Sequence, residues 1–298
     1  MAVQVYLDGK YVDKDEAKIS VWDHGLLYGD GVFEGIRAYN GRVFRLDEHL
    51  RRLYDSLKSV HIKIPLSRAE MKKAVLQTLR LNAIRDGYVR LIITRGKGDL
   101  GIDPRKCSKA TIIIMADKIQ LYPQEYYEKG LKLTFASTRR NISEALNPRI
   151  KSLNYLNNIM AKIEAIEAGY QEAIMLNAQG FVCECTTENI FLIRDGILTT
   201  PPVWAGALEG VTRNTVIELA RKEGIPIREE LFTGHDIYIA DECFITGTGA
   251  EILPVIEVCG RTIGEGVPGP STRRLLAAYR DITTREGTPI HEKESLTV

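Results

Sequence analysis

The feature that most constrains the fold of this 298-residue chain is a two-residue turn, Asn40-Gly41, between two apolar stretches. Both residues accept the left-handed backbone of a tight hairpin turn, so they predict a β-hairpin with strands at 32–39 and 43–45. Asp47 follows closely, and as an N-cap it predicts a helix running to about residue 60. Apolar residues recur there at helical spacing: Leu46, Leu50, Leu53, Tyr54 and Leu57. A hairpin that leads into an amphipathic helix indicates an α+β domain.

The rest of the first half continues this pattern. Ser67 and Glu70 form a capping box, which predicts a second helix to about residue 82. Further strands are expected at 5–7, 88–94 and 110–115. The stretch 117–130 is polar and contains Pro123, so we expect a linker there.

The second half alternates short strands with helices. A helix expected at 156–168 ends at Gly169, and Asp195-Gly196 predicts another hairpin. Other helices are expected at 212–222 and 271–281, and strands at 131–136, 172–176, 181–185, 190–193, 242–246 and 255–258. From residue 285 the chain is polar, which predicts a frayed end. The predicted division is a small α+β domain at 1–119, an interdomain loop at 120–129 and a large domain at 130–298.

Composition argues against several classes of protein. The formal net charge is +1 and the basic doublets are short and scattered, so no nucleic-acid partner is expected. The five cysteines lack the spacing of a disulfide framework, and the five histidines lack the spacing of metal ligands. The start lacks a signal-peptide pattern, and the longest apolar runs are far too short to span a membrane. We expect a cytoplasmic protein with reduced thiols and no metal.

Two residues in the second half suggest cofactor chemistry. Glu184 lies in an expected strand between Cys183 and Cys185, so its side chain points to the opposite face from theirs. An acid flanked by small, usually buried residues needs a partner, and a protonated ring nitrogen would serve. The amine of Lys151 could hold such a ring as a Schiff base. The pair suggests pyridoxal phosphate, although on spacing alone a solvated lysine and an exposed or salt-bridged glutamate are the more common explanation.

Three segments could bind an anion. Arg52 lies on the helix after Asp47, and its guanidinium could bind a phosphate with two parallel bonds. Gly210-Val211-Thr212 opens a helix whose first N–H groups favour an anion. Thr246-Gly247-Thr248-Gly249 follows a strand and would allow close backbone approach. Each has an ordinary alternative, namely a solvated arginine, a water-capped helix or a simple turn.

Two strands could line a substrate pocket. Phe33, Gly35 and Arg37 alternate onto one face of the first, and Tyr88 and Arg90 share a face of the second. Aromatic rings beside guanidinium groups suit a substrate with an apolar end and a carboxylate. A solvent-facing strand would show the same pattern.

Taken in order, these segments resemble the branched-chain amino acid aminotransferases, which are pyridoxal-phosphate enzymes of fold type IV. The likeness covers most of the chain, from near residue 20 to near residue 270. Its motifs are residues 28–37, 48–53, 88–90, 151–155, 184–189, 210–213 and 240–251. The resemblance implies a mixed α+β and α/β fold of two domains with the active site at their interface. It also implies homodimers or larger assemblies and a roof over the site from about residues 120–128, where Tyr122 has no assigned role.

The resemblance also implies roles. Lys151 would bind the cofactor and shuttle the proton, Glu184 would pair with the ring nitrogen, and Tyr155 would bond to the phenolic oxygen. The phosphate would be held by Arg52, the N–H groups of Val211 and Thr212, and Thr248. The substrate pocket would contain Tyr28, Phe33, Gly35, Arg37, Tyr88, Arg90, Thr248 and Gly249. The implied reaction moves the amino group of leucine, isoleucine or valine to 2-oxoglutarate by a ping-pong mechanism.

The chain departs from the family at informative places. Leu91 follows Arg90 where bacterial members often have proline, and Thr94-Arg95-Gly96 is similar to relatives that act on D-amino acids or (R)-amines. The stretch between Lys151 and Tyr155 lacks the usual glycines. A D-amino acid or (R)-amine transaminase is therefore the alternative of the same fold, with an aminodeoxychorismate lyase behind it. A non-catalytic binding protein is the alternative of another class, and retention of Lys151 argues against it.

Overall fold

The computed structural model describes residues 2–118 and 122–291. Contacts divide the chain into two compact units. The first contains the described residues of Met1–Ile119, Lys151–Asn154 and Thr283–Val298, and the second those of Gln120–Ile150 and Tyr155–Ile282. Four residues around Lys151 therefore group with the first unit, although they lie within 130–298 in sequence. The predicted domains at 1–119 and 130–298, with a loop at 120–129 between them, remain a prediction.

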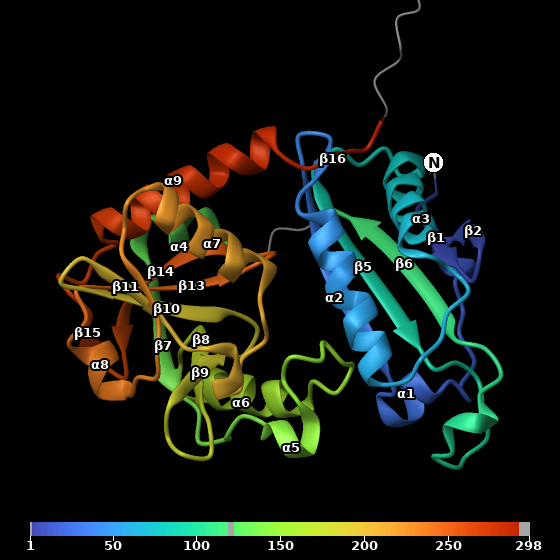
Figure 1. Ribbon diagram of the computed structural model, residues 1–298, viewed down its shortest axis with the longest axis horizontal. Coiled ribbons are helices and arrows are strands. Elements are labelled where there is room, and N and C mark those ends of the chain that lie inside the picture. Colours follow the sequence, from blue (N-terminus) through green and yellow to red (C-terminus); the bar gives the residue numbers. More distant parts are fainter. Residues whose placement is uncertain (1, 119–121, 292–298) are drawn as a thin grey trace, which may run out of the picture. The chain divides into compact units, whose positions relative to one another are not determined.

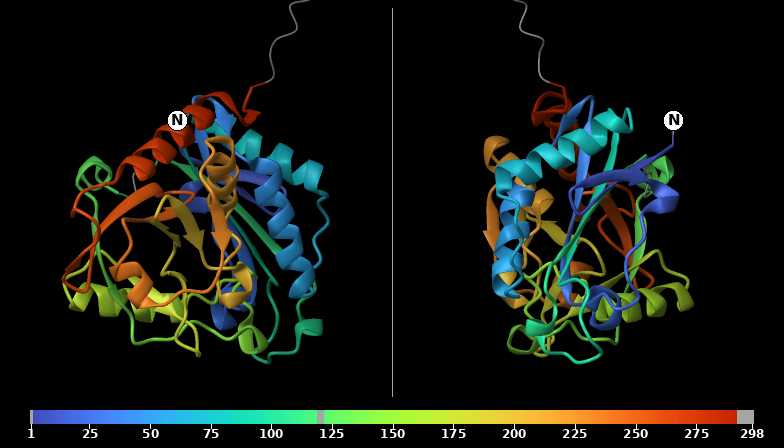
Figure 2. Two further views of the ribbon diagram at one scale, coloured as in Figure 1. Left: turned by 60° about the vertical axis from the view of Figure 1, so that its left-hand side comes forward. Right: turned by 90° about the vertical axis from the view of Figure 1, so that its right-hand side faces the viewer.

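The first unit contains a seven-stranded antiparallel sheet in the order β16-β4-β3-β5-β6-β1-β2. Helices α2 (Leu46–Ser59) and α3 (Arg68–Leu81) cover one face of this sheet (Figures 1 and 2). Short helices α1 (His24–Tyr28), η1 (Lys14–Glu16) and η2 (Pro104–Lys106) lie in connections. The strands are β1 (Gln4–Leu7), β2 (Lys10–Asp13), β3 (Gly31–Tyr39), β4 (Arg42–Val43), β5 (Gly87–Thr94), β6 (Thr111–Asp117) and β16 (Thr288–Pro289).

The hairpin at Asn40-Gly41 is confirmed, with φ of 48° and 75° at the two turn residues. Its second strand ends at Val43, because Arg45 adopts φ of 49° and becomes the N-cap of α2. Asp47 is therefore in the first turn of the helix and is not its cap, where its charge still suits the helix dipole. The capping box of Ser67 and Glu70 is confirmed at the start of α3.

The second unit contains a nine-stranded sheet in the order β12-β11-β10-β13-β14-β7-β8-β9, with β15 paired to β14. Parallel pairs join β7 to β8, β7 to β14 and β11 to β12. The strands are β7 (Leu131–Phe135), β8 (Glu172–Leu176), β9 (Val182–Cys185), β10 (Asn189–Arg194), β11 (Ile197–Thr200), β12 (Ile227–Glu229), β13 (Glu242–Gly247), β14 (Glu251–Val258) and β15 (Arg261–Thr262). The described residues thus form a mixed α/β structure with two sheets.

Helices pack on this second sheet, among them α6 on β8 and α7 on β13 (Figure 1). The helices are α4 (Gln124–Lys129), α5 (Ser143–Leu146), α6 (Leu156–Glu167), η3 (Val203–Ala205), α7 (Val211–Lys222), α8 (Gly234–Tyr238) and α9 (Pro270–Arg285). The expected hairpin at Asp195-Gly196 is present, with positive φ at both residues.

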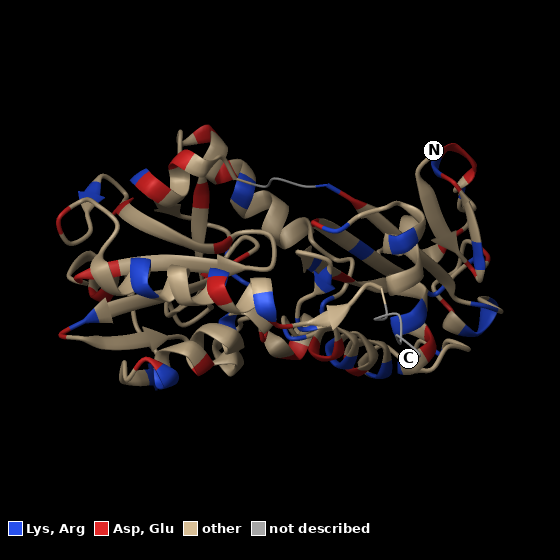
Figure 3. Ribbon diagram, turned by 90° about the horizontal axis from the view of Figure 1, so that it is seen from above, with Lys and Arg blue, Asp and Glu red and all other residues tan. Residues whose placement is uncertain are grey.

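Two expectations of irregular chain were wrong. The expected linker contains helix α4, and residues beyond 285 include β16, which pairs with β4. The linker positions 119–121 and the tail at 292–298 lie outside the described residues. Within the described part of the chain, no helix is both long and apolar enough to cross a membrane. Charges of both signs are interspersed in each unit (Figure 3).

Candidate active site

Lys151 is attached to the first sheet by its own backbone. The N–H of Phe33 donates to the carbonyl of Lys151 at 3.0 Å, and Leu153 donates to the carbonyl of Gly31 at 2.9 Å. From the helix side, the hydroxyl of Ser56 on α2 accepts from the N–H of Lys151 at 3.3 Å. The position of Lys151 is therefore set by β3 and α2.

The side chain of Lys151 lies over an aromatic ring. Its Nζ is 4.6 Å from the ring centroid of Phe33, and Cζ of Arg90 is 4.7 Å from the same centroid. Cζ of Arg90 also lies 5.5 Å from the ring centroid of Tyr88. Cations near an aromatic ring are attracted by its electron-rich face. The structure thus brings together four residues that the sequence placed at one site.

The two expected pocket strands are direct neighbours, with Gly35 opposite Arg90 and Arg37 opposite Tyr88. Directly opposed residues share a face, so the register of the two strands joins the two predicted faces into one. A Cβ on Gly35 would lie 1.8 Å from the hydroxyl oxygen of Tyr88. With the ring of Tyr88 in this position, only glycine fits at position 35.

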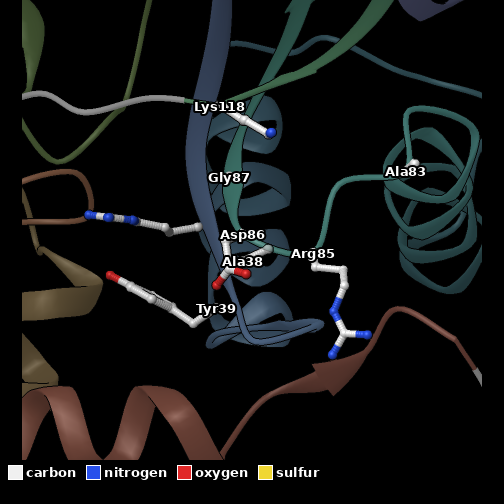
Figure 4. A pocket seen from close by; sticks show the side chains of 8 residues that line it. Ala38, Tyr39, Ala83, Arg85, Asp86, Gly87 and Lys118 are labelled. Atoms are coloured by element: carbon white, nitrogen blue, oxygen red, sulfur yellow. The ribbon is translucent and has the colours of Figure 1, made fainter. Parts of the chain in front are cut away.

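The same strands border a pocket of about 460 Å³ near Arg37. Its lining residues are Arg37, Ala38, Tyr39, Ala83, Arg85, Asp86, Gly87 and Lys118. In Figure 4 the side chain of Arg85 points away from that of Lys118, and both residues are exposed. The pocket therefore offers scattered surface cations and no converging set of polar groups.

Tyr28 lies on α1. Its hydroxyl donates to the carbonyl of Leu100, and its ring packs edge-on against His24 with centroids 5.1 Å apart. The side chain is 38% exposed. Its predicted contact with substrate stays a prediction.

Arg52 takes part in a buried cluster that the sequence did not reveal. Its Nε and Nη2 donate to the two carboxylate oxygens of Glu34, each at 2.7 Å. Nδ1 of His49 lies 2.8 Å from the same carboxylate. Glu34 is on β3 and fully buried, while His49 and Arg52 are one turn apart on α2. One carboxylate thus holds two side chains of the helix.

The charges in this cluster compensate each other. Burial alone would raise the pKa of Glu34, but the charge of Arg52 and the hydrogen bonds from Arg52 and His49 lower it to about 2. Burial lowers the pKa of His49, and the charges of Arg52 and Lys151 lower it further against the effect of Glu34. At neutral pH a neutral His49 therefore donates to an ionised Glu34.

Glu184 in the second unit is also paired with an arginine. Nε of Arg140 donates to one oxygen of Glu184 at 2.8 Å, and the N–H of Leu208 donates to the other at 2.8 Å. The predicted need of Glu184 for a partner is thus met within the chain, by Arg140 and a backbone amide. A carboxylate can accept about four hydrogen bonds, so these two leave acceptor capacity for a ring N–H.

Arg140 links Glu184 to the start of α6. Its Nη1 donates to the side-chain oxygens of Asn157 at 3.0 Å and Asn158 at 3.2 Å. Tyr155 is the N-cap residue of this helix. The structure therefore ties the elements that carry Glu184 and Tyr155 together through Arg140.

The start of α7 has the features of an anion site. Its N-cap, Gly210, provides no side-chain cap, and the first turn contains no acidic residue. A Cβ on Gly210 would lie 2.1 Å from Oδ1 of Asn189, which is opposite Thr246 in the sheet. The hydroxyl of Thr246 is buried and has no hydrogen-bond partner within the described residues. Buried polar atoms normally have a partner, so this region suits a polar ligand.

Thr248 and Gly249 lie in the turn that joins β13 to β14, and Gly249 is buried. Tyr122 is half-buried in the second unit, where its hydroxyl donates to Glu188 at 3.0 Å. Thr187 donates to the same oxygen of Glu188 at 2.7 Å. Tyr122 thus has a partner inside its own unit.

Residues 31–258 match the family described as amino-transferase class IV. The chain belongs to the class IV aminotransferases. A relative from Methanocaldococcus jannaschii is 53% identical over 291 residues, which cover 98% of this chain and all of the relative. The name of that relative assigns it branched-chain-amino-acid aminotransferase activity provisionally.

Solved class IV aminotransferases share the fold. The branched-chain aminotransferase of Thermoproteus uzoniensis, solved with norvaline, is 40% identical with a TM-score of 0.91, covering 98% of this chain and all of that one. The T.th. branched-chain amino acid aminotransferase has been solved with N-(5'-phosphopyridoxyl)-L-glutamate and with 4-methylvaleric acid. Each of these two structures is 36% identical, with a TM-score of 0.91 and coverage of 95% of both chains. The predicted fold class is therefore confirmed.

Class IV aminotransferases are enzymes that use pyridoxal 5'-phosphate, so the predicted enzyme class and cofactor are also confirmed. The residues of this chain fit that cofactor. The start of α7 and the buried hydroxyl of Thr246 suit a phosphate, and Glu184 retains acceptor capacity for a ring nitrogen. A lysine amine, Lys151, lies over an aromatic ring beside an arginine.

Sequence reasoning missed Glu34, His49 and Arg140. One signal for Glu34 was available, because it is a charged residue on the strand face that otherwise carries Val32, Ile36 and Ala38. An acid on an apolar face needs a cation opposite, and the adjacent helix provides one. Arg140 lies in a loop with no periodic pattern, so nothing in the sequence distinguished it from a surface arginine.

Proposed function

We propose that this aminotransferase moves the amino group between branched-chain L-amino acids and 2-oxoglutarate by a ping-pong mechanism. The observation that carries the proposal is the side chain of Lys151, which lies with Arg90 around the ring of Phe33. An apolar ring suits an aliphatic side chain and a guanidinium suits a carboxylate, as leucine and glutamate require. Relatives solved with norvaline, 4-methylvaleric acid and a phosphopyridoxyl-glutamate support the same choice.

Lys151 is proposed as the residue that binds the cofactor and moves the proton. When bound, pyridoxal phosphate supplies an electron sink for the substrate carbon that loses its proton. The amine of Lys151 takes that proton from the substrate Cα and later returns one. Its backbone bonds to Phe33 and Ser56 fix the point from which the side chain that carries the amine extends.

Glu184 is proposed to keep the ring nitrogen protonated, with Arg140 and the N–H of Leu208 fixing its carboxylate. Tyr155 would bond to the phenolic oxygen of the cofactor. Arg52, the N–H groups of Val211 and Thr212, and Thr248 would hold its phosphate.

For the substrate, we propose a face formed by Phe33, Gly35, Arg37, Tyr88 and Arg90, with Tyr28, Thr248 and Gly249 completing the pocket. Phe33 and Tyr88 supply aromatic surface, and Arg90 lies close to both rings. A leucine side chain would pack against the rings, while the side-chain carboxylate of glutamate would approach Arg90.

The alternative as a D-amino acid or (R)-amine transaminase has less support. The sequence feature that suggested this alternative was Thr94-Arg95-Gly96. In the structure, Nη2 of Arg95 donates to Asp30 at 3.1 Å and to the carbonyl of Val60 at 2.7 Å. These bonds give Arg95 a structural role within its unit, and the relatives compared above are named for branched-chain substrates.

A homodimer or larger assembly, in the cytoplasm, completes the proposal. Helix α6 exposes apolar side chains at Leu156, Ile159, Met160 and Ile163. These positions follow helical spacing, and exposed apolar patches often mark protein contacts. Light scattering of the pure protein would measure the assembly.

The visible absorption spectrum of the pure protein tests the proposed reaction. A yellow band that disappears with L-leucine and returns with 2-oxoglutarate is expected. Bleaching by D-alanine or an amine, and not by leucine, would support the alternative. Lys151→Ala is the control, because it should keep cofactor binding through phosphate and ring contacts but lose turnover by several orders of magnitude. Near-normal turnover in that variant would refute the role of Lys151.

A further inference from the structure

We infer that Glu34 is a positioning residue for the cofactor phosphate, because it fixes the guanidinium of Arg52 in the orientation that a phosphomonoester requires. The inference rests on the proposed role of Arg52. Glu34 itself would not contact the cofactor, since both of its oxygens bond to Arg52 and one of them also to His49.

The geometry leaves Arg52 little freedom. Nε and Nη2 form two parallel bonds of 2.7 Å to one carboxylate, which fixes the plane of the guanidinium as well as its position. Glu34 is in turn held by Nδ1 of His49 at 2.8 Å and lies on a central strand of its sheet. The direction of Nη1 is therefore set by β3 and not by the flexible stem of the arginine.

Strand β3 and helix α2 also determine the backbone position of Lys151. Its carbonyl accepts from Phe33, the neighbour of Glu34 on β3, and its N–H donates to Ser56, four residues after Arg52 on α2. Lys151 and Arg52 are thus anchored to adjacent residues of one strand and successive turns of one helix. A cofactor bonded to Lys151 at one end and to Arg52 at the other needs a fixed distance between them, and Glu34 maintains it.

A purely electrostatic view predicts the opposite effect. Glu34 neutralises Arg52, so its removal would leave a net positive charge that attracts phosphate more strongly. We expect orientation to decide, because the side chain of Arg52 is 13% exposed and a guanidinium that has lost its carboxylate partner there would turn toward water. The two views make opposite predictions for one measurement.

The measurement compares the affinities of the full-length protein for pyridoxal 5'-phosphate and for pyridoxal, which lacks the phosphate. Absorbance titrations with each compound give two dissociation constants. The dissociation constant for pyridoxal divided by that for pyridoxal 5'-phosphate reports the phosphate contribution, and a larger ratio means a larger contribution. For Glu34→Gln we expect this ratio to fall roughly 10- to 100-fold while the affinity for pyridoxal stays unchanged. General damage to the fold would instead lower the affinities for both compounds to a similar extent.

Arg52→Gln and the double variant show whether Glu34 acts through Arg52. If it does, adding Glu34→Gln to Arg52→Gln causes no further loss of the phosphate contribution. Asp30→Asn is the matched control, because Asp30 also forms a two-bond pair with an arginine, Arg95, in the same unit. It should leave the ratio at the wild-type value.

Glu34→Asp keeps the charge but shortens the side chain by one methylene, and it covers the case in which Glu34→Gln does not fold. A smaller loss in the same direction is expected. An unchanged or increased phosphate contribution in either variant would overturn the inference, and so would equal losses for pyridoxal and its phosphate. Failure of the wild-type protein to bind pyridoxal phosphate would instead refute the proposed function.

Discussion

The two units each contain a buried arginine–carboxylate pair, and the pairs are used in opposite senses. In the first unit Glu34 holds Arg52, and the arginine is the proposed ligand contact. In the second unit Arg140 holds Glu184, and the carboxylate is the proposed ligand contact. A phosphate requires a cation and a protonated ring nitrogen requires an anion, so each contact has a buried partner of the opposite charge.

The difference shows how a charged ligand contact can be kept inside a protein. An isolated buried ion is costly, whereas an ion pair with additional hydrogen bonds is tolerated. Glu34 receives its additional bond from His49, and Glu184 receives one from the N–H of Leu208. Each pair therefore consists of one proposed ligand contact and one residue that orients it.

Within the two pairs, the largest effect on turnover is expected from Glu184→Gln. The amide retains the shape and can still accept a hydrogen bond from Arg140, but it no longer favours a protonated ring. We expect kcat to fall roughly 100-fold or more while cofactor affinity changes much less. Steady-state kinetics and cofactor titration measure the two quantities. Unchanged turnover would show that Glu184 has only a structural role.

Arg140→Met tests the other member of the same pair. It leaves a buried carboxylate without its cation, so we expect a loss of about 3–5 kcal/mol in the free energy of unfolding. Urea denaturation of the variant and of the wild type gives this difference. Arg149→Met, which removes an exposed partner of Glu209, is the matched comparison and should cost less than about 1 kcal/mol. Equal costs would contradict the idea that burial distinguishes the pairs.

The ion pair of Glu34 and Arg52 should contribute to the pH dependence of the free energy of unfolding at acidic pH. Because the pKa of Glu34 is lowered to about 2 in the folded state, its contribution is present above the ordinary value of 4.5 and is lost as pH falls from there toward 2. Glu34→Gln should remove on the order of a few kcal/mol at neutral pH and flatten the dependence between pH 5 and pH 2. Unfolding curves at several pH values check this. Parallel curves for variant and wild type would refute it.

Glu188 should show the opposite sign, because it accepts bonds from hydroxyl groups and not from a guanidinium. Burial and the nearby charge of Glu172 raise the pKa of Glu188 above its ordinary 4.5 in the folded state. Stability is then lost as pH rises from 4.5 through the raised value. Glu188→Gln should remove that loss. The free energy of unfolding of the variant, relative to that of the wild type, should therefore be higher at pH 8 than at pH 5 by roughly 1 kcal/mol. Melting temperatures at the two pH values would reveal the sign.

The sequence predicted many of the regular elements and indicated candidate ligand contacts, but it did not reveal the residues that hold those candidates in place. The turn at Asn40-Gly41 and the capping box at Ser67 are local signals, and both appear as expected. The end of the strand before Arg45 was not predicted, because a left-handed φ is uncommon for a residue other than glycine and no local pattern indicated it. Short elements such as α1, α8 and β16 are too brief to show periodicity.

The site followed the same rule. Phe33 and Gly35 could be placed on one face of β3, and Tyr88 and Arg90 on one face of β5, since strand alternation requires only local geometry. The register of the two strands, which the sequence did not predict, makes these faces one. Glu34 and Arg52 are 18 residues apart, and Arg140 and Glu184 are 44 apart. Pairings at such separations depend on tertiary packing, which the alternation of one segment does not contain.

The contact between Gly35 and Tyr88 has a consequence for enzyme engineering. A Cβ at position 35 would lie 1.8 Å from the hydroxyl oxygen of Tyr88, so a side chain at position 35 requires the ring of Tyr88 to move or to be replaced by a smaller residue. We expect a methyl group at position 35 to be tolerated better with a small residue at position 88 than with tyrosine there. A library of single substitutions would not contain variants with a side chain at position 35 and a small residue at position 88. A library that randomises both codons together would contain them.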